Sequence, residues 1–319
     1  MSALKLNELK DIENLEADIA KSASMSQDPS TASTNGQDQD DLREDTILQR
    51  NSSSQLSLLE LQSPDYIKLK SNLPDVNLKY KFGPVPKDDK KVFFFDIDNC
   101  LYQRSYKIHD LMQIYIHRFF KKTLQLNDEE AHELHLRYYK EYGLAIEGLV
   151  RHHKINALEY NKVVDDALPL DQILKPNPKL REMLLHLRKS GKVDRLWLFT
   201  NAYKNHGIRV IKLLGLGDCF DGLTFCDYAE FPLTCKPMKA MFDKALNDAG
   251  VSDPKNAYFI DDSGLNVKAA NQLGWGKIIQ YVEREEDIPE LVGDHDEARE
   301  GIHVIRDVLE LREVCKELF

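Results

Sequence analysis

Two aspartates, Asp96 and Asp98, directly follow an apolar run at residues 92–95, which consists of one valine and three phenylalanines. Such a run is typical of a strand buried on both faces of a parallel sheet. In open α/β sheets, ligands bind outside the carboxyl ends of the strands. Two carboxylates spaced i, i+2 at that place indicate a metal site, a covalent nucleophile with its acid/base partner, or both.

Polar residues follow two further apolar runs in the same way. The run at 195–199 leads into Thr200 and Asn201, and the run at 257–260 leads into Asp261 and Asp262. Lys236 lies between them, flanked by a cysteine and a proline. Taken singly, a Thr-Asn pair is an ordinary helix N-cap, a lysine an ordinary surface residue and an Asp-Asp pair an ordinary turn. As ends of neighbouring parallel strands, these residues are predicted to converge on one edge of a sheet.

The segment between the first two strand ends is long and mostly helical. About 100 residues separate Asp98 from Thr200, whereas a simple βαβ crossover needs only a dozen or more. We predict helices at residues 108–120, 128–142, 146–153, 157–166 and 180–190, and later strands at 222–226, 277–282 and 301–305 before a helix at 307–318. The predicted fold is therefore α/β: a Rossmann-like parallel sheet core (91–104 and 177–319) with an inserted α-helical cap (105–176).

Along the chain the motifs follow in the order Asp96-x-Asp98, Thr200-Asn201, Lys236 and Asp261-Asp262. These four motifs resemble those of the haloacid dehalogenase-like superfamily of phosphohydrolases, and the resemblance covers residues 91–282. The amino-acid sequences of segments 93–99, 198–206 and 258–263 are similar to those of the pyrimidine 5′-nucleotidase branch of fungi and plants. The resemblance implies a cap that closes over the active site. It also implies hydrolysis of nucleoside 5′-monophosphates, with UMP and CMP preferred.

Phosphate ester hydrolysis needs a nucleophile, a proton for the leaving oxygen and positive charge on the phosphoryl oxygens. We assign Asp96 as the nucleophile that forms an aspartyl-phosphate, and Asp98 as the general acid/base. True dehalogenases of this superfamily lack the carboxylate at position 98, so its presence favours a phosphatase. Thr200, Asn201 and Lys236 are expected to bind the phosphoryl group.

A cation is required because an anionic nucleophile would repel a phosphate dianion, and Mg²⁺ suits carboxylate and phosphate oxygens. The expected ligands are the side chains of Asp96 and Asp261 and, as the resemblance implies, the backbone carbonyl of Asp98. Asp262 is expected to orient a metal-bound water or Lys236.

The chemistry of the residues does not identify the substrate. Tyr142, in the cap, and His206, after the second strand, are candidate substrate contacts. The helical pattern favours packing of Tyr142 inside the cap, and His206 is equally suited to form a wall of the pocket or to cap its own helix. Residue chemistry alone does not choose between a nucleotide, a sugar phosphate and lysophosphatidic acid. A non-enzymatic regulatory protein on a retired phosphatase fold is the other alternative, disfavoured because the complete set of motif residues is present.

Composition limits the class of protein. The chain has 319 residues, a net charge of −10 and five cysteines without a Cys-x-x-Cys pair. The negative charge disfavours nucleic-acid binding. No apolar run is long enough for membrane insertion, and the N-terminus lacks the apolar core of a secretory signal peptide. Reduced thiols indicate a cytoplasmic or nuclear protein. Residues 1–75 are predicted to be a disordered tail, with a short amphipathic helix at 4–20 as an alternative. The oligomeric state is left open.

Overall fold

The computed structural model describes residues 73–81, 90–284 and 301–319. Its centre is a six-stranded sheet in the order β3-β2-β1-β4-β5-β6, and every pairing is parallel. The strands are β1 (Val92–Phe95), β2 (Arg195–Phe199), β3 (Gly222–Thr224), β4 (Ala257–Asp261), β5 (Lys277–Tyr281) and β6 (Ile302–Ile305). The predicted α/β fold is confirmed, and β1 is a central strand between β2 and β4.

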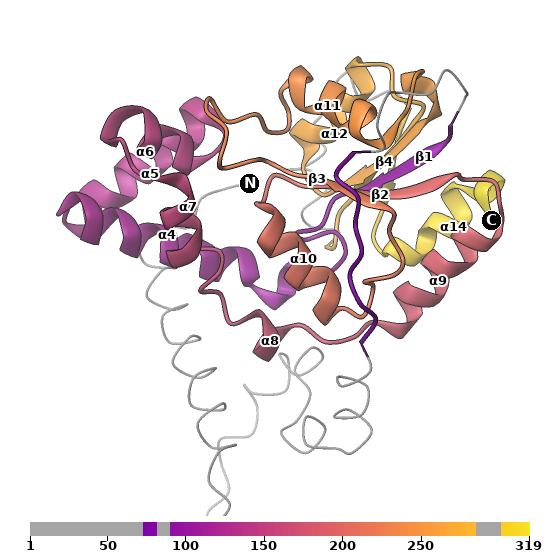
Figure 1. Cartoon of the computed structure of the whole chain (residues 1–319), viewed down its shortest axis with the longest axis horizontal. Coiled ribbons are helices and arrows are strands. Elements are labelled where there is room, and N and C mark those ends of the chain that lie inside the picture. Colours follow the sequence, from indigo (N-terminus) through magenta and orange to yellow (C-terminus); the bar gives the residue numbers. More distant parts are fainter. Residues whose placement is uncertain (1–72, 82–89, 285–300) are drawn as a thin grey trace, which may run out of the picture.

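The phenylalanines of β1 build two separate cores because successive side chains of a strand point to opposite faces. Phe93 and Phe95 join the cluster that includes helices α9 (Pro178–Lys189), α10 (Lys204–Leu213) and α14 (Leu311–Val314). Phe94 joins the cluster beneath α11 (Lys239–Ala249) and α12 (Gly264–Gln272). The sheet is thus covered on both faces (Figure 1), which explains the continuous apolar runs in its strands.

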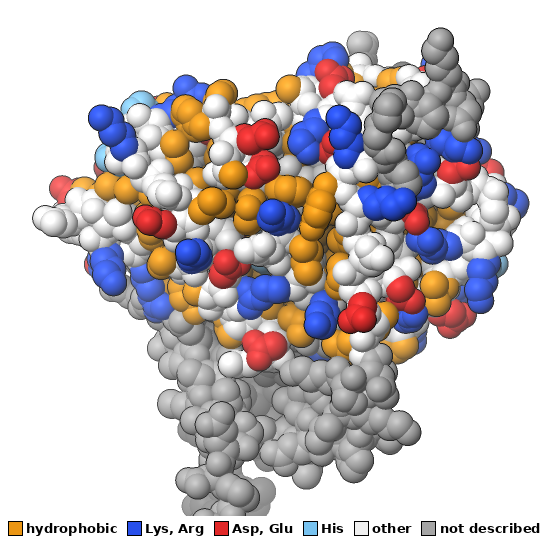
Figure 2. All heavy atoms as spheres, viewed as in Figure 1, with side chains coloured by type: hydrophobic (Ala, Val, Ile, Leu, Met, Phe, Trp, Pro, Cys, Tyr) orange, Lys and Arg blue, Asp and Glu red, His pale blue; other side chains and the backbone are white. Residues whose placement is uncertain are grey.

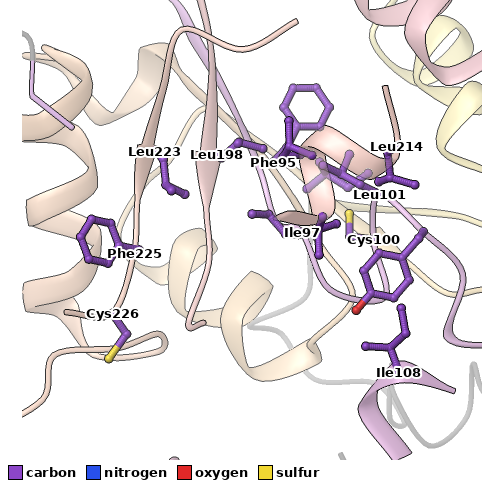
Figure 3. Close-up of a cluster of buried hydrophobic side chains, with 14 of the residues drawn as sticks. Phe95, Ile97, Cys100, Leu101, Ile108, Leu198, Leu214, Leu223, Phe225 and Cys226 are labelled. Atoms are coloured by element: carbon purple, nitrogen blue, oxygen red, sulfur yellow. The ribbon is translucent and has the colours of Figure 1, made fainter. Parts of the chain in front are cut away.

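The residues that follow β1 continue into the first of these cores. Ile97, Cys100 and Leu101 are all buried. Figure 3 shows them beside Phe95 and Leu198, in a cluster that also extends to Ile108 at the start of the next helix. The loop that carries Asp96 and Asp98 is therefore anchored by apolar side chains.

A helical region, defined here as residues 104–173, lies between β1 and β2. It consists of η2 (Arg104–Tyr106), α4 (Ile108–Leu124), α5 (Asp128–Tyr142), α6 (Ala145–His153), α7 (Ala157–Val163) and α8 (Leu170–Ile173). Helix α5 begins where predicted, with Asn127 and Glu130 forming a reciprocal capping box. Helices α5 and α6 pack so closely that a Cβ at Gly148 would lie 2.1 Å from the Tyr138 ring.

The ends of the described chain differ from the prediction. The predicted helix at 307–318 is wrong as a continuous element. The structure has η6 (Val308–Glu310), α14 and η7 (Lys316–Leu318) instead, because the backbone at Cys315 leaves helical geometry at φ −120° and ψ 40°. Most of the predicted tail lies outside the described residues. Its described end, residues 73–75, lies against the core, since a Cβ at Gly217 would lie 2.6 Å from the Pro74 carbonyl oxygen. Just after the predicted tail, Lys79 forms a backbone bridge with Gly222.

Candidate active site

The strand ends that the motifs indicated are neighbours. Asp96 immediately follows β1 and donates its backbone N–H to the carbonyl of Ile260 in β4, at 3.0 Å. Asp261 is the last residue of β4, and Thr200 immediately follows β2. The three tips therefore share one edge of the sheet because their strands are adjacent and parallel.

Lys236 joins two of these tips from the loop before α11. Its Nζ donates to Asp96 Oδ1 at 2.7 Å, to Asp261 Oδ2 at 2.6 Å and to the Phe199 carbonyl at 2.7 Å. The lysine is only 2% exposed. Burial alone would lower its pKa, but the two carboxylates outweigh burial and raise it above the usual value. Lys236 is therefore a fixed positive charge inside the site.

Asn201 holds the backbone of Lys236 in place. Its Oδ1 accepts from the Lys236 N–H at 2.7 Å, and its Nδ2 donates to the Lys236 carbonyl at 2.9 Å. The Asn201 side chain is thus engaged with the loop. Thr200 lies beside it, 1% exposed, and its hydroxyl oxygen accepts from the Ala202 N–H at 3.0 Å.

Three carboxylates form a cluster that fits a metal ion. One oxygen from each of Asp96, Asp261 and Asp262 lies within 4.8 Å of the others. Burial first, and then mainly Asp261, raises the pKa of Asp262 to about 7. Burial also raises the pKa of Asp96, against the opposing effect of Lys236. Carboxylate oxygens at such spacing are the ligands that Mg²⁺ prefers, and a cation would relieve their mutual repulsion.

The side chain of Asp261 is oriented by a residue that the motifs did not single out. Asn266, in the first turn of α12, donates from Nδ2 to both oxygens of Asp261, at 3.0 and 3.1 Å. The Ser263 N–H donates to Oδ1 of the same carboxylate at 2.8 Å. An amide five residues after the strand-end aspartate is the only sequence signal for this role.

Asp98 lies apart from the carboxylate cluster. Its Oδ1 accepts from the Tyr102 hydroxyl at 2.6 Å and lies 2.6 Å from Nε2 of His206. Burial alone would raise the pKa of Asp98, but His206 and Tyr102 together lower it below the ordinary value. Its side chain keeps 23% exposure, whereas the His206 side chain has none. Asp98 therefore faces the open side of the site, and His206 lies behind it.

The two predicted substrate contacts lie in different surroundings. His206 is fully buried against Asp98 and does not cap its helix, whose N-cap residue is Tyr203. Tyr142 has its hydroxyl 2.8 Å from Nε2 of His152, within the α5–α6 pair. Tyr139, which the sequence did not select, is half-buried, and burial first and then the charge of Asp262 raise its pKa. Its position one residue after buried Tyr138 is set by the packing of α5.

Charged groups elsewhere on the surface are mixed. On the described part of the face in Figure 2, basic and acidic side chains are interspersed rather than gathered into one basic stripe. The five cysteines are all free and buried. Within the described ranges, no helix is both long and apolar enough to cross a bilayer.

Comparison with known proteins places this geometry in a family. Residues 90–274 match the family model described as haloacid dehalogenase-like hydrolase. Phosphate metabolism protein 8 of Saccharomyces cerevisiae is 44% identical over 235 residues, which cover 72% of this chain and 73% of that protein. Two solved structures are more distant. A predicted phosphatase from Clostridium acetobutylicum is 13% identical, with a TM-score of 0.49 and coverage of 72% of this chain and all of that one. The magnesium-bound HAD-hydrolase YfnB from Bacillus subtilis is 15% identical, with a TM-score of 0.43 and coverage of 71% and 99%.

The match to the family model spans more than half of the chain, and it contains all the strand-end residues described above. This chain belongs to the haloacid dehalogenase-like hydrolase family.

Proposed function

We propose that this protein is a magnesium-dependent phosphomonoesterase that acts through an aspartyl-phosphate on Asp96. The observation that carries the proposal is the buried lysine between two carboxylates: Lys236 Nζ lies 2.7 Å from Asp96 and 2.6 Å from Asp261. This arrangement places a fixed cation beside the nucleophile and leaves Asp98 as a separate carboxylate for proton transfer.

In the first step, an Asp96 oxygen attacks phosphorus and the bond from phosphorus to the ester oxygen breaks. The negative charge of the bound phosphate raises the pKa of Asp98 against the effect of His206 and Tyr102, so that Asp98 enters this step protonated and gives its proton to the departing alkoxide. Lys236, the Thr200 hydroxyl and the backbone N–H of Asn201 stabilise the negative charge on the phosphoryl oxygens. In the second step, Asp98 takes a proton from water, which attacks phosphorus and releases phosphate and free Asp96.

Asp96, Asp261 and the backbone carbonyl of Asp98 would hold the metal, with Asp262 of the same cluster orienting one of its waters. Bound magnesium would supply positive charge that shields the nucleophile from the phosphate dianion. The donor set supports this assignment because it consists of hard oxygen ligands close enough together to share one ion.

For the substrate, we propose nucleoside 5′-monophosphates, with UMP and CMP preferred, under a cap formed by residues 105–176. The similarity of the three strand-end segments to pyrimidine 5′-nucleotidases supports this choice. The half-buried Tyr139 supports it as well, since an aromatic ring near Asp262 suits stacking on a base. The name of the yeast relative, a phosphate metabolism protein, agrees with phosphate ester chemistry in general.

The test is phosphate release from UMP, CMP, AMP, GMP, glucose 6-phosphate and lysophosphatidic acid, each with magnesium and with EDTA. We expect magnesium-dependent turnover with the highest kcat/KM for UMP and CMP. The highest kcat/KM for another member would keep the chemistry and refute the pyrimidine assignment.

Asp96→Asn is the control for mechanism. This variant should have no measurable turnover of any substrate while its thermal unfolding remains cooperative. Normal UMP hydrolysis by Asp96→Asn would refute the role of Asp96 as nucleophile.

A further inference from the structure

The two oxygens of Asp98 are treated differently by the protein. Oδ1 accepts the Tyr102 hydroxyl at 2.6 Å and also faces His206 Nε2 at 2.6 Å. Because an ionised carboxylate oxygen can only accept, the imidazole nitrogen is the donor in the second contact. No described side chain or backbone group hydrogen-bonds Oδ2. One oxygen is therefore held by the protein and the other is left for the reaction.

His206 has no access to solvent or to an open pocket. Its side chain is 0% exposed, and Nδ1 has no hydrogen-bond partner within the described structure. The imidazole thus makes one polar contact, with Asp98. A buried histidine with a single partner acts on the site through that partner.

Close packing of α10 brings His206 to this position. A Cβ at Gly207 would lie 3.0 Å from Ile97 Cδ1, so the helix lies directly against the residue between the two catalytic aspartates. One turn further along, Arg209 donates to the backbone carbonyls of residues 165, 166 and 168, where the chain leaves α7. The first turn of α10 therefore packs against the loop that carries Asp98. Arg209, further along the helix, binds the segment that leads from α7 to α8.

We propose that His206 is a positioning residue for Asp98: together with Tyr102 it holds Oδ1, so that Oδ2 alone exchanges the proton with the leaving group and with water. This inference rests on the proposed phosphatase function. It assigns to His206 a role through Asp98 instead of a contact with substrate. Without these two hydrogen bonds, the carboxyl group would rotate and would spend part of its time in unproductive orientations.

A matched pair of variants tests the donated hydrogen bond. His206→Gln keeps an amide N–H near the place of Nε2, and His206→Met has a similar length without a donor. We expect His206→Met to lower kcat for UMP by about 10- to 100-fold, the size typical of residues that orient catalytic groups. Its KM should stay nearly constant, and His206→Gln should recover most of the lost kcat. Tyr102→Phe, which removes the other donor to Oδ1, should lower kcat in the same direction.

The leaving group gives a second readout that simple loss of packing would not move. p-Nitrophenyl phosphate has a leaving group that departs without a proton, so His206→Met should lower its kcat/KM, which covers the leaving-group step and not the shared hydrolysis of the aspartyl-phosphate, less than that of UMP. Equal losses for both substrates, a wild-type kcat in His206→Met, or a His206→Gln variant as slow as His206→Met would each overturn the proposal.

An imidazole spectrum separates this inference from the proposed function. The ¹⁵N resonance of His206 Nε2 should have a different chemical shift in Asp98→Asn, which lacks the carboxylate, than in the wild-type protein. If wild type hydrolyses no phosphate ester but the resonance moves, the phosphatase function fails and the contact stands. If wild type is active and the resonance does not move, the positioning role fails on its own. The same spectrum decides the matter should both His206 variants fold poorly.

Discussion

Phe94 in the sheet and Tyr138 in the helical region are both buried aromatic residues with different surroundings. Phe94 packs among other rings, with centroids 4.8 Å from Trp275 and 6.2 Å from Phe199. Tyr138 stacks on His152 at 5.4 Å, and its hydroxyl lies 2.7 Å from Nε2 of His153. The sheet core is held by shape and apolar contact, whereas the interior of the helical region also depends on directional polar pairs.

This difference matches what each region contributes. The apolar core fixes strand ends, so the charges at those ends keep their distances. Polar pairs in the helical region, such as His117 with Asp128 at 3.0 Å, are satisfied in one relative arrangement of the helices. Substitutions at the strand ends should therefore act mainly on chemistry, and substitutions in the helical region on stability and on the placement of its contacts with the core.

The largest effect is expected at Lys236. Lys236→Ala removes the cation shared by Asp96 and Asp261 and should lower kcat by about 1,000-fold. Because two buried carboxylates lose their partner, the free energy of unfolding in EDTA should fall by about 3 kcal/mol. Steady-state kinetics and urea unfolding measure the two effects. Lys239→Ala is the matched control, since it breaks an exposed i, i+4 pair with Asp243 and should be nearly neutral.

Gly148→Ala tests the close contact between α5 and α6. The added Cβ would lie 2.1 Å from the Tyr138 ring, so the two helices must separate. We expect the free energy of unfolding to fall by about 2–3 kcal/mol. Gly143→Asn, where space is open and φ is +79°, should be tolerated. An unchanged unfolding midpoint for Gly148→Ala would show that these helices are not held together by this packing.

A substitution at Glu147 tests the contact between the helical region and the segment that leads to Lys236. Its Oε2 accepts the buried Leu233 N–H at 3.0 Å, and its Oε1 accepts Arg151 Nε at 2.6 Å. Glu147→Ala leaves the amide without a partner and should cost about 1–2 kcal/mol of stability. Hydrogen exchange at Leu233 should accelerate, while Glu147→Gln, which keeps one acceptor oxygen, should show a smaller change. Equal protection in both variants would contradict the link.

A pH dependence of stability is expected from Asp165. Burial first, opposed by His206, raises the pKa of this carboxyl to about 7 in the folded protein. Its folded pKa exceeds the unfolded value, so its contribution to stability is present below about pH 4 and is lost as pH rises through about 7. Asp165→Asn should therefore be more stable relative to wild type at pH 8 than at pH 5. Equal differences in Tm at the two pH values would exclude this titration.

Much of the fold followed from local patterns. Apolar runs located each strand of the described residues within about two residues, and the cap signal at Asn127 located the start of α5. The predicted periodic apolar residues of the C-terminal helix are buried: Val308, Leu311, Cys315 and Leu318. The prediction of one continuous helix nevertheless failed, because Val308, Leu311 and Leu318 lie on three separate short helices and Cys315 lies at the junction of the last two. Periodicity specifies which residues are buried, and it does not specify whether the backbone between them stays helical.

The chain by itself determined that Asp96, Thr200 and Asp261 would meet, because parallel strands place their carboxyl ends at one edge. Only the tertiary structure decided which side chains support them. His206 and Asp98 are 108 residues apart, and their contact depends on how closely α10 packs against Ile97. Likewise, the charge of Asp262 contributes to the raised pKa of Tyr139, whereas the Tyr142 hydroxyl pairs with His152. Such contacts arise from the relative placement of whole elements, which no local spacing specifies.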